Sequence, residues 1–131
     1  MIEPAAIPAE IEAIARTVLD GAFAVHRALG PGLLESAYEA CLAHDLGRRG
    51  MTIARQVNVP VSYEGLQLDA GFRLDLLAAD AVIVEVKAVE RFTPLHTAQV
   101  MTYLKLTGKR LGLLINFNTP LLRDGIKRVV L

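Results

Sequence analysis

A chain of 131 residues is long enough for one domain with a packed core and leaves little room for a second. Hydrophobic residues make up 53% of it and charged residues 21%, a balance that excludes an intrinsically disordered protein. The 14 basic residues are matched by 14 acidic ones. The chain therefore lacks the overall basic excess of proteins that bind a phosphate backbone unaided, and any contact with nucleic acid has to come from a local patch or a partner.

The composition also bears on the cellular compartment of the protein. The single cysteine, Cys41, excludes an internal disulfide and is typical of a reducing compartment. We find no signal-peptide pattern at the N-terminus and no apolar stretch of the ~20 residues that cross a bilayer. We therefore expect a cytoplasmic protein without membrane contact. Cys41 has no evident base partner and is expected to be a core thiol. His26 and His44 lack metal-ligand spacing and are expected to be structural or surface residues.

The chain begins with two predicted helices. Apolar residues recur at steps of three and four over residues 8–29, which predicts one amphipathic helix. The segment 30–32, Gly-Pro-Gly, should end it, because proline lacks a backbone N–H and glycine tolerates a left-handed backbone. A second helix is expected over residues 33–48, ending near Gly50.

Three predicted strands follow. Alternating apolar and polar residues over 53–63 indicate a half-buried strand, and Glu64-Gly65 should turn the chain into a second strand over 66–77. Gly71 inside that strand suggests a bulge or bend. The apolar run 81–89 predicts a third strand.

The rest of the chain adds one helix and one or two strands. Thr93-Pro94 is typical of a helix start, and this helix should stop at Gly108. Residues 111–116 predict a buried strand, and residues 125–131 a short edge strand. The order ααβββαβ(β) predicts an α/β (α+β) fold, in which helices flank a mixed sheet of four to five strands.

Asp75, Glu85 and Lys87 are the residues most suggestive of chemistry. Side chains two apart on a strand share a face, so Glu85 and Lys87 project together, and Asp75 should face the same way from the neighbouring strand. In the strand of Asp75, Phe72, Leu74 and Leu76 should share the opposite face. Two adjacent carboxylates repel each other unless a cation lies between them, and their hard oxygens suit Mg²⁺ or Mn²⁺. A lysine beside such a cation can hold a phosphate or orient an attacking water.

The alternative interpretation is that these charges form an ordinary solvated strand face. Acidic residues near strand ends are common, and a Glu-x-Lys pair occurs on many edge strands. However, residues 82–89 resemble a central strand, where two charges are expensive to bury without a purpose. This position favours a functional site.

Polar side chains on two helices extend the set. Glu35 and Tyr38 share a face of the second helix, so Glu35 is either a further metal ligand or a first-turn acid favoured by the helix dipole. His96, Gln99 and Tyr103 form a stripe on the third helix. That stripe either faces the charges of the sheet or faces solvent.

Several segments also match a known family pattern in order. They are Gly32-x-x-Glu35-x-x-Tyr38, the acidic strand 72–76, the Glu-x-Lys strand 85–88, the helix 95–105 and the strand 112–117. In these segments the chain resembles the GxxExxY protein family, a branch of the PD-(D/E)xK nuclease superfamily. The resemblance starts at Val18, so residues 1–17 lie outside it, and residues 1–131 are expected to form a single nuclease-like domain.

The resemblance implies a restriction-endonuclease-like core and a role for each matching residue. Asp75 and Glu85 would be metal ligands and Lys87 the catalytic lysine. Glu35 would be the helix carboxylate that supports the metal, with Gln99 and Tyr103 as supporting residues of the helix. Leu74 stands where the superfamily's name has proline.

Two functions remain open at this point. One is a Mg²⁺- or Mn²⁺-dependent nuclease that hydrolyses phosphodiesters in DNA or RNA. The other is a non-catalytic interaction module that keeps the fold. The neutral charge and high apolar fraction favour this second reading and invite a homodimer.

Overall fold

The structure of the protein, a computed structural model, describes residues 5–131. One mixed sheet holds five strands in the order β1-β2-β3-β4-β5, so spatial order equals chain order. The strands are β1 (Ile53–Tyr63), β2 (Leu66–Ala78), β3 (Val82–Lys87), β4 (Leu111–Asn116) and β5 (Ile126–Val130). Strands β3 and β4 are parallel and the other neighbours antiparallel, which confirms the predicted mixed sheet.

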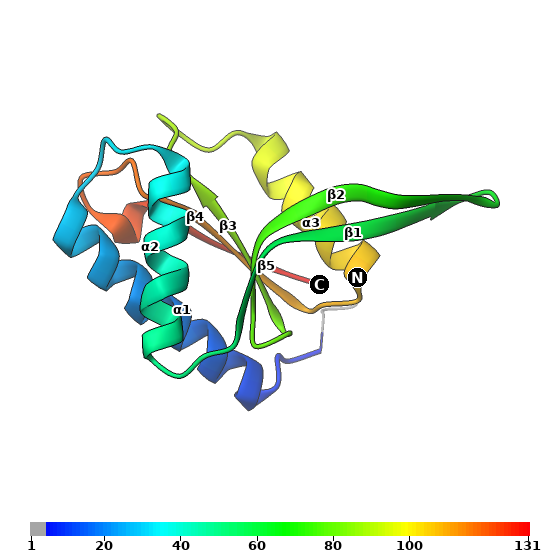
Figure 1. Ribbon diagram of the computed structural model, residues 1–131, viewed down its shortest axis with the longest axis horizontal. Coiled ribbons are helices and arrows are strands. Elements are labelled where there is room, and N and C mark those ends of the chain that lie inside the picture. The colour runs from blue at the N-terminus through cyan, green and yellow to red at the C-terminus, as the bar shows by residue number, and fades with distance from the viewer. Residues whose placement is uncertain (1–4) are drawn as a thin grey trace.

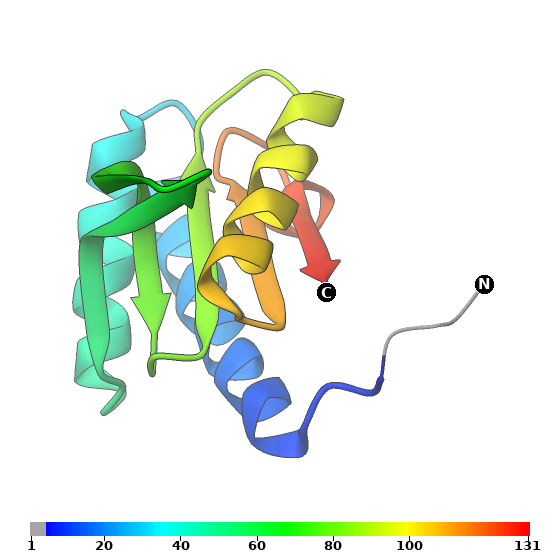
Figure 2. The same ribbon diagram turned by 90° about the vertical axis from the view of Figure 1, so that its right-hand side faces the viewer.

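Helices cover both faces of this sheet. Helices α1 (Ala9–Leu29) and α2 (Glu35–Arg48) pack on one face, while α3 (Pro94–Thr107) packs on the other and provides the crossover from β3 to β4 (Figures 1 and 2). A 3-10 helix, η1 (Leu122–Gly125), leads into β5. Within residues 5–131, none of the helices has the length and hydrophobicity required to cross a bilayer.

The two faces have separate cores. The α1/α2 core includes residues of both helices and of three strands, among them Val18, Tyr38, Leu42, Leu76, Val84, Val86, Ile115 and Phe117. The α3 core is smaller and includes Val59, Leu74, Ile83, Val100, Leu104, Leu114 and Val129. Because β3 contributes to both cores, it is a central strand, as its apolar sequence predicts.

The hairpin of β1 and β2 extends beyond the rest of the molecule as an arm, defined as residues 60–71 (Figure 1). The turn at residues 64–65 has two positive φ angles, 46° and 85°, as the predicted tight turn requires. The register shifts between Val59 and Val61, opposite Gly71, which confirms the predicted irregularity. A Cβ atom at Gly71 would lie 2.1 Å from Cγ2 of Val61, so the close approach of the strands requires glycine.

One expectation about the sheet is wrong. Leu74 and Leu76 do not share a face, because Leu76 packs in the α1/α2 core and Leu74 in the α3 core. The partner strand changes face in the same way, with Ile53 against the first core and Val57 against the second. The physical reason is Gln56, whose left-handed backbone (φ 51°) interrupts the period-two alternation of β1.

Tyr38 ties the loop between α1 and α2 to the core. Its ring is fully buried and stacks on Phe117 with a centroid separation of 4.7 Å. Its hydroxyl donates to the carbonyl of Gly30 at 2.6 Å and accepts from the backbone N–H of Leu33 at 3.0 Å. Tyr38 is therefore a structural residue of the motif that contains Glu35.

Replacing Tyr38 with Phe is expected to lower the free energy of unfolding by ~1–2 kcal/mol, since the ring stays and both hydrogen bonds are lost. Urea denaturation monitored by circular dichroism measures this change. Tyr63→Phe is the matched control, because the ring of Tyr63 lies exposed at the tip of the arm. Equal effects of the two substitutions would contradict the structural role of the Tyr38 hydroxyl.

Candidate active site

Asp75 and Glu85 face each other where β2 and β3 separate. The two strands pair up to Leu76 and Val84. Beyond that pair, side chains replace the backbone ladder: the N–H of Asp75 donates to Oε2 of Glu85 at 2.9 Å, and the N–H of Val86 donates to Oδ2 of Asp75 at 2.8 Å. Each carboxylate is thus held against the backbone of the opposite strand, and the expected proximity of the two acids is found.

Burial makes this pair electrostatically expensive. Glu85 is only 5% exposed, and burial, followed by the charge of Asp75, raises its pKa to about 8. Burial also raises the pKa of Asp75, against the lowering effect of the hydrogen bond from Val86, and the charge of Glu39 raises it further. The positive charge of Lys87 lowers the pKa of both carboxyls without cancelling these effects. An additional cation would therefore be bound favourably between them.

The donor set fits a hard divalent cation coordinated partly by water or substrate. The backbone hydrogen bonds use Oδ2 of Asp75 and Oε2 of Glu85, which leaves Oδ1 and Oε1. No buried side-chain oxygen lacks a partner within residues 5–131, so these two oxygens retain contact with solvent. The described residues contain no cluster of three or more His, Cys, Asp or Glu side chains able to hold a metal. The chain thus offers two carboxylates, as Mg²⁺ sites often do.

Lys87 completes the strand part of the set. It follows Glu85 by two residues at the end of β3, is half-buried, and pairs in register with Asn116 of β4. In the described part of the chain its ammonium forms no ion pair within 4.0 Å. The ammonium is therefore near enough to act on the carboxyl pKa values while remaining free to contact a third group.

Helix α3 brings one aromatic residue toward the pair. Tyr103 stacks on Phe72 of β2 with a centroid separation of 4.5 Å. Its pKa is raised by burial and then by the charges of Glu85 and Asp75, so the phenol lies within their field. Gln99, one turn earlier, is half-buried.

His96 does not join the other two members of the predicted stripe. Its Nδ1 accepts from the backbone N–H of Thr93 at 3.1 Å, so it caps the N-terminus of α3. Tyr103, in contrast, lies within the electrostatic field of the two carboxylates. His96 therefore has a capping role, whereas Tyr103 lies above the sheet.

Helix α2 contributes differently from the sequence-based expectation. Glu35, its first residue, is exposed, and its charge contributes to raising the pKa of Asp75 and of Glu85. Glu39, which we did not predict, is buried and has the larger effect on Asp75. The sequence signal for Glu39 was its spacing: it follows Glu35 by four residues and so lies on the same helix face.

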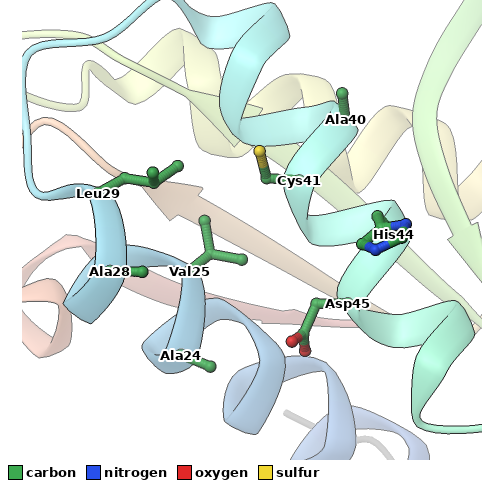
Figure 3. A pocket seen from close by; sticks show the side chains of 8 residues that line it. All are labelled: Ala24, Val25, Ala28, Leu29, Ala40, Cys41, His44 and Asp45. Atoms are coloured by element: carbon green, nitrogen blue, oxygen red, sulfur yellow. The ribbon is translucent and has the colours of Figure 1, made fainter.

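The remaining polar candidates lie away from the pair. The ring of His26 contacts the carbonyl oxygen of Thr119 at 2.8 Å, a structural role as expected. Cys41 packs against the α1/α2 core but is only partly buried, so the prediction of a core thiol holds in part. Its side chain borders a hollow of about 330 Å³ between α1 and α2 (Figure 3), because the small side chains of Ala24, Ala28 and Ala40 leave space there.

A model of the PD-(D/E)XK nuclease superfamily matches residues 12–129, nearly the whole chain. The chain therefore belongs to this superfamily. The arrangement of two helices, a mixed five-stranded sheet and a crossover helix agrees with the superfamily core. No curated protein and no solved structure matches the chain.

Proposed function

We propose that this protein is a Mg²⁺- or Mn²⁺-dependent phosphodiesterase that cleaves DNA or RNA, with Asp75 and Glu85 as its metal ligands. The observation that carries the proposal is the pairing of a buried Glu85 with a half-buried Asp75 at the separation of β2 and β3. Because the pKa of Glu85 is raised to about 8, the folded protein is less stable with this carboxyl ionised than with it neutral. Such a costly group in a nuclease-superfamily fold supports a cation site.

The residues around the pair have distinct roles in this proposal. A bound divalent cation supplies Lewis-acid chemistry and lowers the pKa of a water molecule. Asp75 and Glu85 offer Oδ1 and Oε1 from a rigid backbone, so their geometry is fixed before substrate binds. Lys87 places a positive charge where it can bind the scissile phosphate or orient the attacking water. Tyr103 supports the site from α3.

Three finer assignments belong to the same proposal. The segments with Gly32, Glu35 and Tyr38 support membership of the GxxExxY family. Glu35 reaches the site as an outer carboxylate and Gln99 as a supporting amide. Residues 1–131 act as one domain, located in the cytoplasm.

A second candidate function, a non-catalytic interaction module, is favoured by the arm. Residues 60–71 contain no lysine or arginine, carry Glu64 and Asp69, and expose Tyr63, Leu66 and Leu68. Such a surface repels a phosphate backbone and suits a protein partner, for which we propose a second copy of this chain. Light scattering distinguishes a dimer from a monomer, and loss of the dimer in Leu66→Lys would assign the contact to the arm.

The nuclease proposal is tested with purified protein and labelled single- and double-stranded DNA and RNA. Cleavage is expected in Mg²⁺ or Mn²⁺ and is expected to stop in EDTA. Lys87→Ala should lower kcat by ~10²-fold, because the positive charge that binds the phosphate or orients the attacking water is lost. Lys105→Ala, which removes an exposed lysine of α3, is the matched control. Unaltered cleavage by Lys87→Ala, or a wild type inactive on every substrate, would contradict the proposal.

A further inference from the structure

Gln56 occupies an unusual position in β1, directly across from the candidate site. Between the ladder pairs Arg55–Leu76 and Val57–Leu74, Gln56 stands opposite Asp75. Its φ of 51° is left-handed, a conformation that a glutamine inside a strand adopts only when its surroundings impose it. Something outside the strand must therefore hold this residue.

The residue that holds it is Glu39 of α2. Oε1 of Glu39 accepts from Nε2 of Gln56 at 2.6 Å, and Oε2 accepts from Nη2 of Arg55 at 3.1 Å. Glu39 is 7% exposed, so both bonds are charge-assisted and shielded from water on the helix side. A buried glutamate thus fastens two consecutive residues of β1 to the helix.

The left-handed backbone of Gln56 stands opposite Asp75, where the alternation of the hairpin is interrupted. The hairpin changes face at this level: Leu76 packs in the α1/α2 core, and Leu74 in the α3 core. The change of face falls at the level where β2 leaves the regular ladder with β3. At the same level the N–H of Asp75 donates to Glu85, and the carboxylate of Asp75 accepts from the N–H of Val86.

We infer that Glu39 is a positioning residue, which locks the left-handed Gln56 and thereby sets the twist of the hairpin that brings Asp75 to Glu85. Its importance for catalysis rests on the proposed function, whereas its effect on the geometry of the pair does not. Arg55 contributes less to this positioning, because its side chain is about half exposed and exposed ion pairs contribute little to stability.

Backbone hydrogen exchange on the metal-free protein, measured by NMR, tests the geometry. In Glu39→Ala the amides of Asp75 and Val86 should exchange about tenfold faster or more, since both depend on the twist of the hairpin. The backbone amides of Leu77 and Ile83, which pair in the regular part of the β2–β3 ladder, serve as the internal reference. Glu39→Gln should restore near wild-type exchange, because its amide oxygen still accepts from Gln56, and Arg55→Ala should leave exchange nearly unchanged.

A second variant separates the loss of the Glu39–Gln56 hydrogen bond from any loss of stability of α2. Gln56→Ala removes the same hydrogen bond from the strand side, so it should accelerate the same two amides even if Glu39→Ala does not fold. Selective acceleration in every one of the two variants that folds supports the inference. Wild-type exchange at Asp75 and Val86 in a folded Glu39→Ala or Gln56→Ala protein would overturn it.

Cleavage kinetics provide the functional readout. Glu39→Ala should lower kcat about tenfold or more with little change in KM, because substrate contacts remain while the ligand pair is misplaced. Glu39→Gln should recover most of the activity. Altered exchange with no cleavage by the wild type would reject the nuclease proposal and keep the positioning role. Unaltered exchange in an active enzyme would reject the positioning role and keep the nuclease proposal.

Discussion

Asp75→Asn is expected to lower kcat/KM for metal-dependent cleavage by ~10²- to 10⁴-fold. Asparagine keeps an oxygen that can accept from the N–H of Val86, so the local fold should persist. It removes the negative charge that would hold a cation with Glu85. Cleavage rates and calorimetric titration with Mn²⁺ measure the two consequences, and both catalysis and binding should weaken together.

Asp69→Asn is the matched control for this substitution. Asp69 lies on the same strand, β2, but its carboxylate is exposed on the arm. Its removal changes the net charge equally and should leave kcat/KM within about twofold. If Asp75→Asn remained as active as Asp69→Asn, Asp75 would have no part in the reaction.

The second prediction concerns the stability of the protein as a function of pH. In the metal-free protein, the free energy of unfolding is expected to fall as the pH rises from about 4.5 to about 8. Glu85 keeps its proton up to a pKa of about 8 in the folded state but releases it near 4.5 in the unfolded chain. The folded state therefore binds the additional proton in this window, and stability decreases by about 1.4 kcal/mol per pH unit for that one proton. The raised pKa of Asp75 acts with the same sign.

Urea denaturation between about pH 5 and pH 9, in the presence of a chelator, measures this dependence. Glu85→Gln should remove most of the decline and exceed the wild type in stability above pH 8, because the neutral amide avoids the cost of burying a charge and the repulsion by Asp75. Glu64→Gln, at the exposed tip of the arm, should keep the wild-type slope. Added Mg²⁺ should reduce the decline, since the cation binds the ionised pair. A wild-type profile as flat as that of Glu85→Gln would contradict the burial of this charge.

Much of the fold could be predicted from the sequence because local signals coincide with the element ends. Thr93-Pro94 and Gly108 bracket α3, and the turn at residues 64–65 closes the hairpin. The face of Leu76 could not be predicted. The break in alternation comes from a glutamine with a left-handed backbone, and Gln56 carries no glycine or proline signal to indicate it.

The candidate site was predictable to the extent that it depends on neighbouring strands. Asp75 and Glu85 are brought together by a short connector, so their proximity followed from local sequence. The importance of Glu39 depends on how α2 packs against β1, a tertiary contact without a local signature. The same limit explains Cys41, whose exposure is set by the spacing of two helices.

The sequential order of the strands has a consequence for how the protein folds. Asp75 and Glu85 are ten residues apart in the chain, joined through a tight turn in which Ala79 and Asp80 have φ angles of 50° and 55°. Contacts this local require little loop closure, so we expect the hairpin to form before the crossover helix delivers β4 to the edge of the sheet. We therefore expect the repulsion between the two carboxylates to lower the rate of folding as well as the stability of the folded protein.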